Sequence, residues 1–267
     1  MRQGRLPKKL AFPKKGQRKP VQFMSTTATD PMVTAMCEAG LHYGYGKSRR
    51  HATIKPYIFG VKNGIEIIDL EKTKALLDEA TKFARELGAT GKRLLFVGTK
   101  HEARVAIYSA AESLGEPYVN NRWIGGTLTN FQEIKKRLLR LEDWKDKKAK
   151  GELAIYTKGE QREIDREVED LERLFGGISD VRATPAAIFV VDPRHEHTAV
   201  REANRLKIQV IALSGTDCDI SNVTYPIIAN DSAKKSISFV VEAIAQAYRE
   251  GRDSENAKPV APAQADS

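Results

Sequence analysis

The chain has 267 residues, of which 41% are hydrophobic and 7% aromatic, and its 44 basic and 35 acidic side chains give a net charge of +9. This apolar content is too high for a wholly disordered protein, and no apolar run comes near the roughly 18 residues that a membrane span requires. Two cysteines, Cys37 and Cys218, are too few for a disulfide framework or a four-thiolate zinc site. The sequence therefore predicts one large domain with an appendage or insertion, in a reducing, cytoplasm-like compartment.

The positive charge is concentrated in the first quarter of the chain. Residues 1–29 contain eight basic side chains and no acid, residues 39–65 have a net charge of +5, and residues 66–267 sum to −2. Such a distribution is typical of polyanion-binding segments attached to a nearly neutral domain. Residues 1–30 include three prolines and lack apolar periodicity, which predicts a basic disordered arm. A transit peptide, a nuclear signal, and a start at Met24 instead of Met1 are the alternatives.

From residue 31 onwards, strand-like and helix-like segments alternate. Helices are predicted at residues 32–40, 75–88, 102–114, 198–206 and 237–248, with Gly251 after the end of the last one. Strands are predicted at residues 55–60, 65–70, 93–97, 117–119, 186–191, 209–213 and 225–228, with Asn63-Gly64 as the turn between the first two. Apolar strands separated by helices indicate a parallel sheet covered on both faces. The predicted fold class is α/β, a flavodoxin-like or Rossmann-like parallel-sheet sandwich.

Residues 127–177 interrupt this alternation with two charged, helix-like segments. Each segment carries one apolar stripe, formed by Phe131, Ile134, Leu138 and Leu141 in the first and by Ile164, Val168, Leu171 and Phe175 in the second. The two stripes predict an inserted antiparallel coiled-coil helical hairpin that projects from the sandwich, and Thr157 to Glu160 has the form of a capping box. The predicted organisation is an arm at 1–30, the sandwich at 31–126 and 178–250, the hairpin at 127–177, and a disordered tail at 251–267.

The segment from Gly40 to Lys55 is the strongest candidate for binding. It resembles a phosphate-binding loop, but five residues separate Gly40 from Gly46 where that motif has four, and a helix precedes it where the motif needs a strand. We interpret it as a flexible basic loop. Its cations would neutralise RNA phosphates and its rings would stack on bases, through Lys47, Arg49, Arg50 and Lys55 and through Tyr43, Tyr45 and His51.

A second set of cations extends this positive surface. Arg122 lies at the exit from the sandwich into the hairpin, and the first hairpin helix carries Lys135, Lys136, Arg137 and Arg140. A solvated charged face is equally usual for such a helix.

No strand is followed by the glycine fingerprint of a dinucleotide site, so no cofactor is predicted.

Residues 192–197, Asp-Pro-Arg-His-Glu-His, lie at the carboxyl end of a predicted strand, where ligands gather in open α/β sheets. They could supply metal ligands or an acid–base pair, which would make the protein an α/β enzyme. Asp192 as a helix N-cap, followed by Pro193 at the first helical position, accounts for the same residues without chemistry. The sequence favours this structural interpretation, and metal binding by His195 and His197 stays open.

Seven motifs occur together in one order: Gly-Leu-His-Tyr-Gly (40–44), Lys-Pro-Tyr-Ile-Phe-Gly (55–60), Ile-Ile-Asp-Leu-Glu-Lys-Thr (67–73), Phe-Val-Gly-Thr-Lys (96–100), Asn-Arg-Trp-Ile-Gly-Gly-Thr-Leu-Thr-Asn (121–130), Phe-Gly-Gly-Ile (175–178) and Ala-Ile-Phe-Val-Val-Asp (187–192). In these motifs the chain resembles the bacterial-type small ribosomal subunit protein two family over about residues 31–251. The sequence departs from the family pattern at Tyr45, which stands for a histidine, and at residues 50–53, which stand for Trp-Asn-Pro-Lys.

The resemblance implies a flavodoxin-like sandwich with a coiled-coil hairpin and a structural, non-catalytic function. It implies binding to small-subunit rRNA during translation, at the junction of head and body, and contact with neighbouring ribosomal proteins, including ribosomal protein one. No membrane, cofactor or small-molecule substrate is expected. The expected location is the bacterial ribosome in the cytoplasm, with an organellar ribosome as the alternative. A freestanding RNA-binding regulator is a further alternative.

Overall fold

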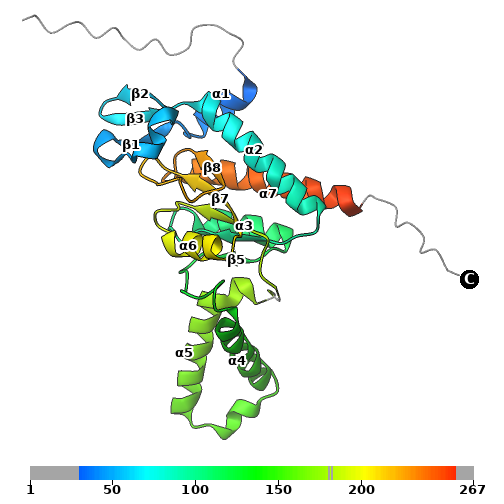
Figure 1. Cartoon of the computed structure of the whole chain (residues 1–267). Helices are drawn as coiled ribbons and strands as arrows, with labels where there is room; N and C mark the ends of the chain where they lie inside the picture. Colours follow the sequence, from blue (N-terminus) through cyan, green and yellow to red (C-terminus); the bar gives the residue numbers. More distant parts are fainter. Residues whose placement is uncertain (1–29, 180, 182, 257–267) are drawn as a thin grey trace, which may run out of the picture. The chain divides into compact units, whose positions relative to one another are not determined.

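The computed structural model describes residues 30–179, 181 and 183–256, and its core is a five-stranded parallel sheet between layers of helices (Figure 1). The strands, in their order across the sheet, are β5 (Tyr118–Val119), β4 (Leu94–Val97), β6 (Ala187–Val191), β7 (Gln209–Ser214) and β8 (Tyr225–Ile228). Counted within this sheet alone, the order is 2-1-3-4-5, which is that of flavodoxin-like folds. The predicted fold class is confirmed.

Alternating residues of the central strands face two different cores. On β6, Phe189 and Val191 belong to one core and Ile188 and Val190 to the other, and all four are fully buried. The first core is shared with α1 (Pro31–Glu38), α2 (Leu70–Ala89), α3 (Arg104–Leu114) and α7 (Lys234–Asn256). The second is shared with α6 (His197–Arg205) and with the base of the hairpin. The continuous apolar runs that predicted these strands follow from this burial on both faces.

The prediction that Gly251 follows the end of the last helix is wrong, because α7 continues through it to Asn256. A Cβ atom at Gly251 would clash with the carbonyl oxygen of Arg85, and one at Gly88 would clash with that of Tyr248. The backbones of α2 and α7 therefore approach too closely for any side chain at these two positions. Gly251 is therefore required by the close packing of two helices, although in the sequence it resembles the glycine that commonly follows a helix end.

A small antiparallel sheet, in the order β1-β3-β2, is formed by β1 (Tyr43–Gly46), β2 (Ile58–Lys62) and β3 (Ile65–Ile68). The predicted turn at Asn63-Gly64 joins β2 to β3, and both residues have positive φ angles, 52° and 81°. The interpretation of residues 40–55 as a flexible loop is wrong, because β1 and two 3₁₀ helices (Lys47–Arg49 and Ala52–Tyr57) fill most of it. The strand predicted from residue 55 begins only at Ile58.

The predicted hairpin is present as α4 (Phe131–Ala149) and α5 (Lys158–Phe175), with a 3₁₀ turn (Glu152–Ile155) between them. Near the sheet, Ile134, Leu138 and Phe175 join the second core, while Leu141, Ile164 and Val168 form a separate cluster further along the hairpin. The predicted capping box is confirmed, since both of its reciprocal hydrogen bonds between Thr157 and Glu160 are formed.

The predicted arm and tail lie outside the described residues, except for Asp30 and residues 251–256. The predicted domain boundaries therefore stay a prediction. Within the described part of the chain, no helix combines the length and apolarity that crossing a membrane requires.

Candidate nucleic-acid interface

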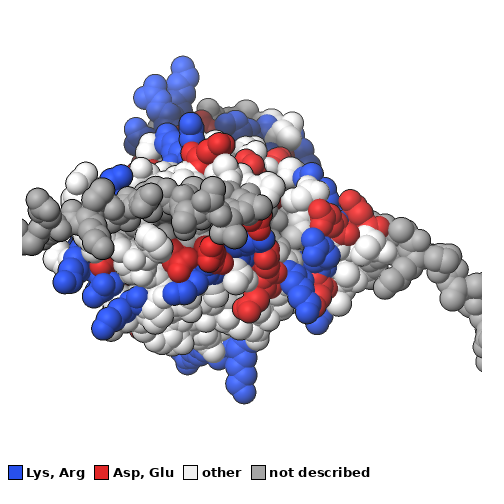
Figure 2. Space-filling model, turned by 90° about the horizontal axis from the view of Figure 1, so that it is seen from above, with Lys and Arg blue, Asp and Glu red and all other residues white. Residues whose placement is uncertain are grey.

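The residues predicted to bind RNA lie in two parts of the structure. Lys47, Arg49, Arg50, His51 and Lys55 follow β1 in the region that we call the basic segment (residues 39–65), and Arg122, Lys135, Lys136 and Arg140 lie at the exit into α4 or on that helix. Four of the nine are exposed and have no ion pair with any residue that the structure describes: Lys47, Lys55, Arg122 and Lys135. Seen from above, basic side chains predominate at the left end of the molecule, where Figure 1 places the small sheet (Figure 2).

Arg49 is held between an aromatic ring and a buried acid. Its guanidinium carbon lies 4.2 Å from the centre of the Tyr45 ring, and Nη2 donates a 3.0 Å hydrogen bond to Oδ2 of Asp217. The Tyr45 hydroxyl is in turn hydrogen-bonded to Oγ of Ser232, at 2.6 Å. Arg49 therefore covers one face of the Tyr45 ring, which the sequence predicts to stack on bases, while Tyr43 is 49% exposed.

Arg50 neutralises a buried carboxylate. Its Nη1 donates a 3.0 Å hydrogen bond to Oε1 of Glu66, whose side chain is completely buried, while the Arg50 side chain is 23% exposed. A buried acid without a cation beside it strongly destabilises a fold. The structure therefore gives Arg50 a structural role beside the predicted phosphate contact, whereas in the sequence Glu66 looks like an ordinary polar position of a strand.

The basic segment is anchored to the carboxyl end of β7. The amide of Tyr45 donates to Oγ1 of Thr216, and the amide of His51 donates to the Thr216 carbonyl, both at 2.9 Å. A Cβ atom at Gly44 would clash with the Thr216 side chain, so this approach requires glycine. The cations of the segment are thus presented on a fixed backbone.

The junction after β6 differs from the sequence interpretation. Asp192 is not the N-cap of a helix beginning at Pro193, because α6 begins only at His197. Instead Asp192 has a φ of 63° and its Oδ1 accepts hydrogen bonds from the amides of Arg194 and His195, at 3.2 and 3.1 Å. These bonds stabilise a turn, which then leads into the helix.

A lysine bridges two carboxylates at this junction. Nζ of Lys100 lies 3.2 Å from Oδ2 of Asp192 and 3.1 Å from Oδ2 of Asp231. Burial acts to lower the pKa of Lys100, but the charges of Asp231 and Asp192 outweigh it and raise that pKa. Burial and the charge of Asp192 raise the pKa of Asp231. Among the described residues, one group has potential metal-ligand atoms close together, and it consists of Asp192, Cys218 and Asp231. Neither His195 nor His197 belongs to this group.

The ligand crevice of this type of sheet lies where the strand order reverses, here between the carboxyl ends of β4 and β6. There Oε1 of the buried Glu196 accepts hydrogen bonds from the amide and the hydroxyl of Thr99, at 2.9 and 2.5 Å. Nδ1 of His195 lies 3.0 Å from the same oxygen. The hydrogen-bond donors of this crevice, which an anionic ligand would need, therefore already donate to a carboxylate of the chain itself.

Glu202, on α6, organises the exit into the hairpin, and sequence reasoning did not identify it. Its carboxylate accepts hydrogen bonds from the Trp123 indole, at 3.1 Å, and from the amides of Gly126, Leu128 and Thr129, at 2.8, 3.0 and 3.1 Å. The Thr129 hydroxyl adds another at 3.1 Å. Burial acts to raise the pKa of Glu202, but these donors outweigh it and lower that pKa. Its partners lie more than 70 residues away, so no local spacing could reveal them.

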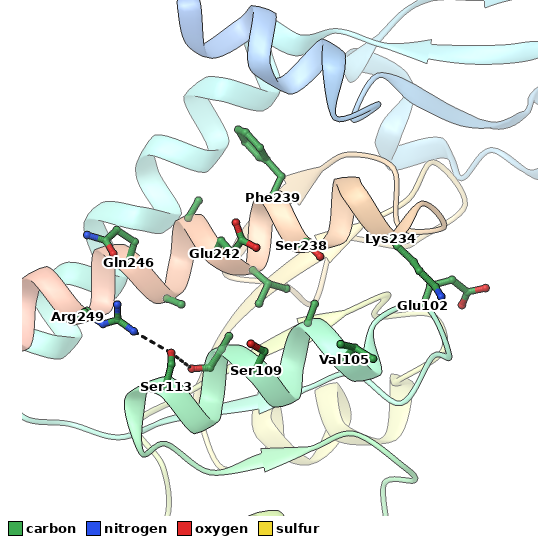
Figure 3. A pocket seen from close by; sticks show the side chains of 15 residues that line it. Glu102, Val105, Ser109, Ser113, Lys234, Ser238, Phe239, Glu242, Gln246 and Arg249 are labelled. Atoms are coloured by element: carbon green, nitrogen blue, oxygen red, sulfur yellow. Dashed lines mark hydrogen bonds between the residues drawn. The ribbon is translucent and has the colours of Figure 1, made fainter.

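A cavity of about 840 Å³ lies elsewhere, between α3 and α7 (Figure 3). Small and apolar side chains line it together with two acids and two bases, Glu102, Glu242, Lys234 and Arg249. Arg249 Nη2 donates a 2.9 Å hydrogen bond to Oγ of Ser113 across it. None of the predicted RNA-binding residues lines this cavity, and its balanced charges do not favour a polyanion.

Comparison of the sequence with those of known proteins shows its family. The family model described as Ribosomal protein S2 matches residues 36–251. The small ribosomal subunit protein uS2 of Roseiflexus sp. (strain RS-1) is 44% identical over 219 residues, which cover 82% of this chain and 84% of that protein. The same protein of Chloroflexus aggregans (strain MD-66 / DSM 9485) is 42% identical over 219 residues, covering 82% and 92%. That of Thermobifida fusca (strain YX) is 43% identical over 229 residues, covering 84% and 77%.

Proposed function

The chain belongs to the ribosomal protein S2 family, and we infer its function from that membership. It is a structural component of the small ribosomal subunit that takes part in translation on the cytoplasmic ribosome, and the enzyme alternative is thereby set aside. We propose that it binds small-subunit rRNA and neighbouring ribosomal proteins, ribosomal protein one among them.

The observation that carries the rRNA proposal is the basic segment. Its five cations have no acid among them in the sequence, and their backbone is fixed on β7 through Thr216. Lys47, Arg49 and Lys55 are exposed, so their charges are accessible to phosphates. These cations would bind rRNA by neutralising its backbone phosphates, the interaction that dominates the affinity of proteins for nucleic acids. His51, with its side chain 40% exposed, lies beside them.

The hairpin has a smaller part in the proposal. Helix α4 carries seven basic and four acidic residues, whereas α5 carries four basic and seven acidic ones, so the two helices together are neutral. Lys136 and Arg140 are hydrogen-bonded to Glu133 and Glu167. Arg122 and Lys135 are the cations on this side that we expect to contact phosphates.

The test compares two pairs of exposed lysines in the full chain. We expect the unaltered protein to co-sediment with small subunits and to leave them as salt is raised. Replacing Lys47 and Lys55 by alanine should make the negative slope of log K against log salt shallower by about 1 per lost contact. Replacing Lys82 and Lys92, also exposed, should leave the slope unchanged. Equal effects of the two pairs would contradict the role of the basic segment, and recovery of the unaltered protein only in the unbound fraction would contradict rRNA binding.

A further inference from the structure

A groove of about 620 Å³ lies where the basic segment meets α6 and the loop after β7. Its lining includes six groups that are or can become cationic: Arg49, Arg50, His51, Arg194, His197 and Arg201. We call it the arginine groove. Residues of the basic segment and of the junction after β6 line it together. In the sequence, the first region is a candidate for RNA binding and the second a candidate for metal or acid–base chemistry. Their residues lie about 145 positions apart, so the groove exists only in the folded chain.

Two arginines in the groove share one buried acid. Nη1 of Arg194 lies 2.6 Å and Nη2 of Arg49 lies 3.0 Å from the same oxygen, Oδ2 of Asp217. The Asp217 side chain is 4% exposed, whereas those of Arg49 and Arg194 are 56% and 58% exposed. One carboxylate cannot neutralise two guanidinium groups, so this trio keeps a net positive charge. Each guanidinium has five N–H donors in a rigid fork, and donors that do not face Asp217 remain for a ligand.

The rest of the groove adds to this positive charge. Arg201 and His197, both exposed, line it from α6, and neither has an ion pair among the described residues. The other acid in the lining is Asp219, whose side chain is 47% exposed and lies 3.9 Å from Nδ1 of His51. Forked, pre-oriented guanidinium groups favour phosphate oxygens, which they can bind bidentately.

We propose that the arginine groove binds a phosphate group of the RNA backbone, with Arg49 and Arg194 as the clamp, Asp217 as the positioning residue and Arg201 as an additional contact. This inference rests on the proposed rRNA binding and adds to it residues that are absent from the predicted interface. Asp217 brings the two like-charged guanidinium groups together, so the orientation is formed before the RNA arrives. Such preorganisation lowers the entropic cost of binding.

The test uses the full chain and purified small-subunit rRNA, with affinity measured across a range of salt concentrations. Replacing Arg194 and Arg201 by alanine should make the negative salt slope shallower by about 1 for each residue. The matched control is Arg205→Ala, because Arg205 is an exposed arginine that lies on α6, as Arg201 does, but does not line the groove. A slope unchanged by the double replacement would overturn the proposal. The Lys47 and Lys55 result would then still decide the wider rRNA assignment separately.

Asp217→Asn separates positioning from net charge. The variant is one charge more positive, so simple electrostatic attraction would strengthen RNA binding. We expect weaker binding instead, because the two guanidinium groups lose the anion that holds them together. Tighter binding, with the thermal unfolding midpoint unchanged, would overturn the positioning role.

Inorganic phosphate distinguishes the two sources of the same chemistry. At matched ionic strength, we expect phosphate to compete with rRNA better than chloride does in the unaltered protein, and no better than chloride in the Arg194 and Arg201 variant, because the two ligands offer the same oxygens to the groove. Saturable phosphate binding that is lost in the Arg194 and Arg201 variant, with rRNA binding unchanged, would make the groove a site for free phosphate and overturn the RNA assignment.

Discussion

The basic segment and the hairpin are both rich in lysine and arginine, but the acids that accompany these cations differ. Beside the basic segment, Glu66 and Asp217 have side chains that are 0% and 4% exposed, so they lie beneath the arginines that they bind. On the hairpin, Glu167 and Glu172 are 33% and 56% exposed, so they lie beside their cations on the surface. A buried acid orients a cation and leaves its outer face available, whereas an exposed acid competes with a ligand for the same charge. The number of cations alone therefore does not identify a polyanion-binding surface.

The largest effect that distinguishes the two regions is expected at Arg50. Replacing it by alanine leaves the fully buried Glu66 without its cation, and removing one partner of a buried pair costs about 3–5 kcal/mol. The free energy of unfolding, measured by urea denaturation, should fall by about that amount.

The second variant of this test removes both charges. Arg50→Ala combined with Glu66→Gln should recover most of the lost stability, because the uncompensated charge is gone. If Arg50→Ala alone cost less than about 1 kcal/mol, in the range of surface ion pairs, the distinction between the two regions would fail.

Some elements of the fold are predictable from the sequence alone, and others are not. The apolar strands, the hairpin stripes and the Asn63-Gly64 turn were predictable because each depends on neighbours within a few residues. The β1 strand was not, because Tyr-Gly-Tyr-Gly has no strand-like apolar pattern. It forms through pairing with β3 and through the hydrogen bond from Tyr45 to Thr216, 171 positions away. Tertiary contacts determined the structure there.

The candidate site follows the same rule. The exposed cations of the basic segment were identifiable from their local clustering. Asp217, Glu202 and Arg201 were not, because each acquires its role from residues that the sheet topology brings to it. Glu202 is the clearest case, since an acid on a helix normally indicates a solvent-facing position, and here the helix places it under the backbone of residues 126–129.

The next effect in size is expected at Glu202, which links the sandwich to the hairpin. Glu202→Gln removes the charge that accepts five hydrogen bonds and turns an amide group toward N–H donors, at a cost of about 2 kcal/mol. Thermal unfolding at neutral pH should report the loss. The control is Glu242→Gln, a glutamate on α7 that lines the open cavity between α3 and α7.

The pH dependence of that loss has a definite sign. The pKa of Glu202 is lowered from its ordinary value of 4.5, so its ionised form stabilises the folded state. This contribution is present above about pH 4.5 and is lost as the pH falls through the lowered pKa. The stability difference between the unaltered protein and Glu202→Gln should therefore be constant at neutral pH and shrink in acid. A difference that grew in acid would contradict the hydrogen-bond arrangement at the hairpin exit.

The smallest effect is expected at the hairpin pair that most resembles Arg50–Glu66 in chemistry. Arg140 and Glu167 approach to 2.8 Å, but their side chains are 59% and 33% exposed. Water and salt screen such a pair, so a double-mutant cycle over Arg140→Ala and Glu167→Ala should give a coupling of about 0.2–1 kcal/mol, smaller at high salt. A coupling above about 2 kcal/mol would mean that the hairpin orients its cations as firmly as the basic segment does. In that case Arg140 would have to be treated as a preorganised RNA contact, equal in standing to Arg49.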